Sequence, residues 1–110
     1  MSVTERLASA YRNELHGAAS RWSLIEGPNP EAIRADSEQA DLADAYRIHF
    51  GKAVGIALST ALLVGHEPAC DLLNIPEVLG LRTASMERRV QGHVWAQAEQ
   101  YRAARDAAAS

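Results

Sequence analysis

The feature that most constrains the fold of this chain is a continuous apolar run in its middle. Between Ala53 and Val64 the only polar side chains are Ser59 and Thr60, and no proline interrupts the run. The apolar residues do not alternate with period two, which argues against a half-exposed strand. A helix that is apolar on every side is normally a buried helix. The sequence therefore predicts a buried central helix over residues 38–64.

The remainder of the sequence also favours helix. Only 5% of the residues are aromatic, alanine is abundant, and β-branched residues do not cluster into strand-like runs. Apolar residues recur at spacings of three and four in two further long segments, 3–25 and 83–106. We expect one all-α domain over residues 1–110: a small helical bundle of three long helices with short connecting helical turns and the central helix buried. The short turns are expected near residues 30–36, 68–73 and 76–80, and the alanine-rich tail, residues 102–110, is expected to fray.

Charge and cysteine content limit the classes of function. The net charge of −3 argues against a protein that coats nucleic acid non-specifically. Cys70 is the only cysteine, so no internal disulfide can form and a reducing compartment is expected. The N-terminal residues contain no apolar signal-peptide core, and the central run is shorter than the roughly 20 residues that cross a bilayer. We therefore expect a cytoplasmic protein without a membrane anchor.

Small residues recur at a spacing of four within the predicted central helix, at Gly51, Gly55 and Ser59. Each glycine costs about 1 kcal/mol relative to alanine in a helix interior, so a compensating contact is expected. Small side chains on one helix face leave a flat groove that another helix can approach closely. The groove predicts either a helix crossing within the chain or the seam of a homodimer.

The aromatic residues Trp22, Trp95 and Tyr101 lie on the two amphipathic segments. Filling the core is their ordinary role, and a position at an interface is the alternative, since tryptophan and tyrosine are enriched there. The apolar stripes are more extensive than a bundle of this length can cover alone. We therefore expect a homodimer with the first or last long helix at the seam, and a protein partner is expected as well.

The segment Gly80–Val90, GLRTASMERRV, resembles the turn and second helix of helix-turn-helix DNA-binding units. In those units a glycine forms the turn and the second helix enters the major groove. The resemblance implies that five residues would face DNA: Arg82, Thr83, Ser85, Arg88 and Arg89. The sequence departs from the pattern at Pro76, which falls within the first helix of the unit. The alternative is a helix–loop–helix corner whose arginines are solvated.

Four histidines, His16, His49, His66 and His93, lie on four different segments. They form a metal or acid–base site only if the fold brings them together. Otherwise each is a hydrogen-bonded histidine at the edge of the core. The sequence contains no phosphate-binding loop, catalytic serine motif or Cys-x-x-Cys motif, so we assign no catalytic residue, metal ligand or cofactor.

These observations leave three functions open. The first is a non-enzymatic helical interaction or regulatory module that acts through a protein partner or as a homodimer. The second is a small DNA-binding transcriptional regulator that uses Gly80–Val90. The third is a helical protein that binds a small molecule or a metal through its histidines. We favour the first, because long apolar helix faces are present and catalytic motifs are not.

Overall fold

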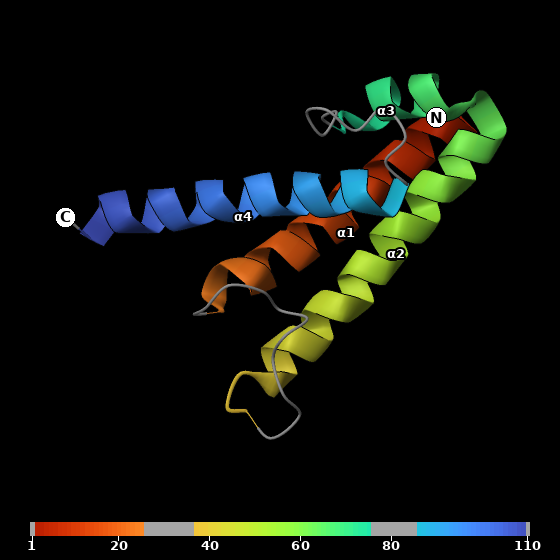
Figure 1. Ribbon diagram of the computed structural model, residues 1–110. Helices are drawn as coiled ribbons and strands as arrows, with labels where there is room; N and C mark the ends of the chain where they lie inside the picture. Colours follow the sequence, from red (N-terminus) through yellow and green to blue (C-terminus); the bar gives the residue numbers. More distant parts are fainter. Residues whose placement is uncertain (1, 26–36, 76–85, 110) are drawn as a thin grey trace.

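The computed structural model describes residues 2–25, 37–75 and 86–109, and these residues form four α-helices. The helices are α1 (Val3–Leu24), α2 (Ala40–Val64), α3 (His66–Leu73) and α4 (Met86–Ala109) (Figure 1). The described ranges contain no β-strand, so the predicted all-α small helical bundle is confirmed. The short turns predicted near residues 30–36 and 76–80 lie outside the described residues.

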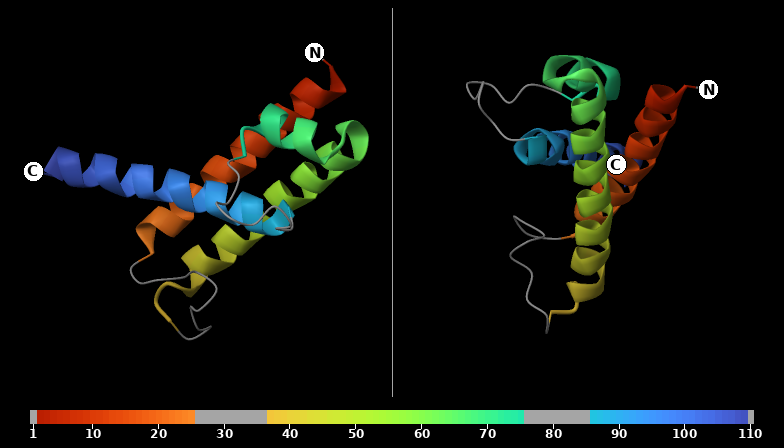
Figure 2. Two further views of the ribbon diagram at one scale, coloured as in Figure 1. Left: turned by 45° about the horizontal axis from the view of Figure 1, so that its top comes forward. Right: turned by 90° about the vertical axis from the view of Figure 1, so that its right-hand side faces the viewer.

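The helices are arranged around the contact between α1 and α2, which is the most extensive one. These two helices lie side by side and run in opposite directions, and α4 crosses them at a steep angle (Figures 1 and 2). α3 lies near the ends where α1 begins and α2 finishes (Figure 2). α4 packs against α1 and α2 through its first half, its contacts with the end of α1 continue to Arg105, and its residues are exposed from residue 103 onward.

α1 forms where the sequence predicts it, because it has both an N-cap and a regular apolar face. The Ser2 hydroxyl accepts a hydrogen bond from the backbone N–H of Glu5 at 3.1 Å, which satisfies one of the free donors of the first turn. The buried apolar residues of α1 recur mostly at spacings of three and four: Ala8, Tyr11, Leu15, Ala18, Ala19 and Trp22. This face meets α2 and α4 and forms one wall of the core.

One side of α2 forms the opposite wall of the core. Its buried residues are Ala43, Tyr46, Phe50, Ala53, Ala57 and Thr60. The Tyr46 ring packs edge-on against Trp22, with 5.2 Å between ring centroids, and is stacked on Phe50 at 5.6 Å. The helix ends at Gly65, whose φ of +96° lies in the region that glycine adopts without strain.

The structure corrects the expectation that the central helix is buried, because α2 is covered on one side only. On its uncovered side Leu62 is 90% exposed and Ile48 is 59% exposed. Among the described residues α2 packs against α1, the short α3 and the first half of α4, and these are too few to surround it. Apolar composition alone does not distinguish a helix enclosed on every side from one whose apolar outer side is open to solvent.

Two predicted boundaries also differ from the structure. α3 is a regular helix of eight residues, His66–Leu73, where we expected one or two helical turns over 68–73. It ends at Asn74, which adopts the left-handed conformation with φ 55°. α4 continues to Ala109, so the tail that we expected to fray is helical in its described part. Alanine favours helix there, and two arginines described below attach this part of α4 to α1.

Candidate functional site

A continuous uncovered surface runs along α2, and we call it the outer face. It consists of residues three or four positions apart on the solvent side of the helix: Ile48, Gly51, Gly55, Leu58, Ser59 and Leu62. Leu62 is 90% exposed, Ile48 59% and Leu58 48%, and the neighbouring Leu63 is 56% exposed. The apolar side chains of the outer face are therefore large, adjacent and in contact with water.

The small residues at the middle of the outer face have open space above them. A Cβ atom added at Gly51 or Gly55 would meet no heavy atom within 4 Å. The Ser59 hydroxyl donates to the carbonyl oxygen of Gly55 at 2.9 Å, so it is satisfied within the helix. The helix crossing that we expected at these residues is not found in the described part of the chain. A seam with a second molecule remains the alternative.

Charged side chains are confined to the first half of α2. Asp44 and Arg47 form an exposed ion pair at 2.7 Å, and Lys52 is exposed beyond them, whereas residues 53–64 carry no charge. Among the described helices α2 is long and apolar enough to cross a bilayer by length and composition. Its uncharged part spans only about 18 Å, against a hydrocarbon core of roughly 30 Å.

Histidine and tyrosine side chains pair across the contact between α1 and α4. The Tyr11 hydroxyl and His93 Nδ1 are 3.0 Å apart, and His16 Nδ1 is hydrogen-bonded to the Tyr101 hydroxyl. Burial lowers the pKa of His93, and the nearby His16 lowers it further. Burial also raises the pKa of Tyr11. Tyr101 thus lies at a contact within the chain, where the two pairs fasten α4 to α1.

His49 connects α2 to α1 instead. Its Nδ1 atom lies 2.6 Å from Glu14 Oε2, and its ring lies over Gly17, where an added Cβ would be only 2.6 Å from Nδ1. Gly17 is therefore what allows the imidazole to approach α1 so closely. His66 is exposed at the start of α3. Within residues 2–25, 37–75 and 86–109, no group of three or more His, Cys, Asp or Glu side chains is placed to hold a metal ion.

Arg89 is buried, which corrects its assignment as a DNA-facing residue. It is 6% exposed, and its Nη1 donates to the Sγ atom of Cys70 at 2.9 Å. Its Nε atom has no hydrogen-bond partner among the described residues. Arg88, by contrast, is exposed and lies beside Trp95. The other residues of the helix-turn-helix prediction lie outside the described residues: Arg82, Thr83 and Ser85.

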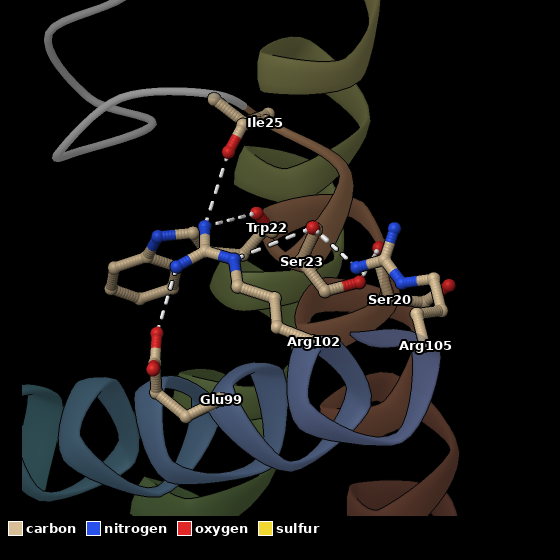
Figure 3. A network of polar contacts seen from close by, with 7 residues as sticks. All are labelled: Ser20, Trp22, Ser23, Ile25, Glu99, Arg102 and Arg105. Carbon is tan, nitrogen blue, oxygen red and sulfur yellow. Dashed lines mark hydrogen bonds and ion pairs between the residues drawn. The ribbon is translucent and has the colours of Figure 1, made fainter. Parts of the chain in front are cut away.

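Two arginines of α4 bind carbonyl groups at the end of α1 (Figure 3). Arg102 Nη2 donates to the carbonyl oxygens of Trp22 at 3.0 Å and Ile25 at 3.1 Å. Arg102 Nε and Arg105 Nη2 both donate to the carbonyl oxygen of Ser23. The last carbonyls of a helix lack partners within the helix and carry partial negative charge. The hollow of about 580 Å³ beside this network is thus bordered by arginines that already cap α1.

The two tryptophans also lie at contacts within the chain. Trp22 is 4% exposed and packs at 5.2 Å from Trp95, measured between ring centroids. Trp95 is 42% exposed, and the guanidinium of Arg102 lies 5.9 Å from the centre of its ring. Trp22 therefore belongs to the core, and Trp95 lies at its edge.

No protein-family model, curated protein or solved structure matches this chain. The spacing of Gly51, Gly55 and Ser59 indicated the small residues of the outer face, whereas Ile48, Leu58 and Leu62 were not predicted to belong to it. Positions 48, 51, 55, 58 and 62 repeat at spacings of three and four, a signal typical of a helix-pairing seam. This periodicity cannot be recognised in the sequence, because the residues between these positions are mostly apolar as well.

Proposed function

We propose that this chain is a non-enzymatic helical interaction module that binds a helical protein partner through the outer face of α2. The observation that carries the proposal is the exposure of large apolar side chains beside two glycines with open space above them. Contiguous apolar surface on a folded domain typically marks a site of interaction. A flat strip flanked by leucine and isoleucine side chains fits a second helix, whose ridge of side chains can lie against it.

The surface is large enough to contribute usefully to binding. Complete burial of a leucine or isoleucine side chain is worth about 1.5–3 kcal/mol. Ile48, Leu58 and Leu62 are 59%, 48% and 90% exposed, so a partner that covers them gains roughly the burial of two full side chains. That is roughly 3–6 kcal/mol, a substantial part of the roughly 8 kcal/mol that corresponds to micromolar affinity.

Within the part of the chain that the structure describes, the histidine, tyrosine and glutamate side chains between the helices stabilise the fold and leave no separate polar site among themselves. Tyr11 is bonded to His93, His16 to Tyr101, and His49 to Glu14, and each pair joins two helices. Their hydrogen-bonding groups are therefore engaged in holding the fold together. Arg89, one of the five residues predicted to contact DNA, is buried and cannot reach DNA in this structure. A protein partner is accordingly the function that the geometry supports best.

Site-specific photocrosslinking in cells tests this proposal. A benzophenone amino acid is placed at Leu62, on the outer face, and in a matched variant at Asn13, an exposed residue of α1 away from that face. Irradiation should give a discrete protein adduct from position 62 and none from position 13. The adduct should disappear when Leu58→Asp is added, because a carboxylate would then be buried at the contact. Absence of any protein adduct at position 62 refutes the proposal.

A further inference from the structure

We infer that the partner of the outer face is a second copy of this chain, bound with the two α2 helices antiparallel and centred on Gly55. This inference rests on the proposed function, because it names the occupant of the same surface. It deepens the expected homodimer by moving its seam from the first or last helix to α2 and by fixing the direction of the two chains.

Five of the six residues of the outer face are arranged symmetrically about Gly55, and the sixth, Leu58, has Lys52 at the matching position. Four residues to either side are the small Gly51 and Ser59, and seven to either side are the large apolar Ile48 and Leu62. A two-fold axis that passes beside Gly55 therefore places small residues against small residues and large apolar residues against large ones. A dimer with two-fold symmetry requires this kind of self-complementary surface.

The distribution of charge selects the antiparallel direction. In a parallel pair each charged residue of the first half of α2 would approach its own twin, so Lys52 would lie near Lys52 of the other copy. Like charges brought together in this way oppose binding. In the antiparallel pair Lys52 lies near Leu58 of the other copy, and its aliphatic stem can cover that side chain while the ammonium group stays in water. In the same arrangement Arg47 of one copy lies near Leu63 of the other, because each is eight residues from Gly55.

The same charges argue against a lipid surface as the occupant. Asp44, Arg47 and Lys52 lie on the solvent side of α2, next to the apolar residues of the outer face. An antiparallel copy leaves these charged groups at the rim of the contact, whereas a bilayer would have to accommodate them within or beside the hydrocarbon. Gly51 and Gly55 add a further argument, because open space above a glycine favours close approach of another backbone, which a helix supplies and a lipid tail does not.

Two measurements on the full chain test the inference. Sedimentation should show a dimer that Gly55→Leu weakens at least tenfold. A Cβ atom added at position 55 meets no heavy atom within 4 Å and the site faces solvent, so the variant should remain folded. Ala103→Leu, at an exposed position of α4, serves as the matched control and should dimerise like the original chain.

Spin-label distances then give the direction of the chains. A label is attached at Asp41→Cys, outside the contact, in a Cys70→Ser background that keeps an acceptor for Arg89. Asp41 lies fourteen residues before Gly55 on the same helix, about 21 Å at 1.5 Å per residue. In the antiparallel dimer the two labels at position 41 should be about 42 Å apart along the helix axis, whereas a parallel dimer would place them at the same height.

The outcomes separate this inference from the proposed function. A dimer whose labels at position 41 lie at the same height along the helix axis refutes the antiparallel arrangement. A chain that sediments as a monomer but gives an adduct with a different protein at Leu62 refutes self-association while the proposed function stands. Monomeric chain that co-floats with phosphatidylglycerol vesicles and gives no protein adduct refutes both.

Discussion

The close contact between Gly17 and His49 allows a stability prediction whose sign can be worked out from the structure. A methyl group at position 17 would lie 2.6 Å from His49 Nδ1, so Gly17→Ala forces the imidazole away from its 2.6 Å contact with Glu14. Overpacking costs about 1–3 kcal/mol, and the lost hydrogen bond costs about 1 kcal/mol because both side chains are partly exposed. Alanine recovers about 1 kcal/mol of helix propensity. We expect Gly17→Ala to lower the free energy of unfolding by about 2 kcal/mol.

Urea unfolding followed by far-ultraviolet circular dichroism measures this change. In a His49→Ala background the obstruction is gone, so Gly17→Ala should instead stabilise the chain by up to about 1 kcal/mol. Asn13→Ala, at an exposed position of the same helix, is the matched control and should stabilise the chain by up to about 0.7 kcal/mol. If Gly17→Ala raises the free energy of unfolding of the original chain, then the imidazole does not occupy the space above Gly17 and the reasoning fails.

Three further predictions concern the other contacts between helices. Because the pKa of His93 is lowered in the folded chain, the free energy of unfolding should be fully retained above pH 6.5 or so and should fall as the pH drops below it. This fall should be smaller in His93→Gln across a pH series of urea titrations, and an unchanged slope would contradict the assignment. Arg89→Met should leave the free energy of unfolding unchanged or raise it, whereas Arg89→Ala should lower it by about 2–4 kcal/mol; a loss of the same size for both would show that the charge itself stabilises the fold. Arg102→Gln should cost about 2 kcal/mol, because the carbonyl of Ile25 loses its side-chain donor and those of Trp22 and Ser23 each lose one of two donors, while Arg88→Gln at an exposed site should change stability by less than about 0.5 kcal/mol; equal effects in calorimetry would refute the capping role.

Local signals in the sequence predicted the helices well. The Ser2 cap, the periodic apolar face of α1 and the stop at Gly65 all act over a few residues, so a single sequence reveals them. Spacings of three and four between apolar residues over 83–106 likewise predicted a long helix there, which the structure shows as α4. These features depend on neighbours three or four positions away along the chain.

Contacts between distant segments could not be predicted in the same way. A run that is apolar on every side does not show which side of α2 is left uncovered, so Leu62 could not be distinguished from Ala57. Arg89 resembled a solvated arginine because its partner, Cys70, lies nineteen residues away on another helix. The pairing of each histidine was likewise undetermined, since His16 and Tyr101 are separated by 85 positions.

The attachment of Arg102 to the end of α1 has a consequence for how the chain folds during synthesis. Arg102 follows Trp22, one of its carbonyl acceptors, by 80 residues. At a translation rate of about 5–20 residues per second, the last turn of α1 exists for roughly 4–16 s without the hydrogen bonds from Arg102. The final turn of α1 is therefore fully capped only when Arg102 of α4 has left the ribosome. A nascent chain arrested before Arg102 should show faster amide hydrogen exchange in that turn than the released protein does.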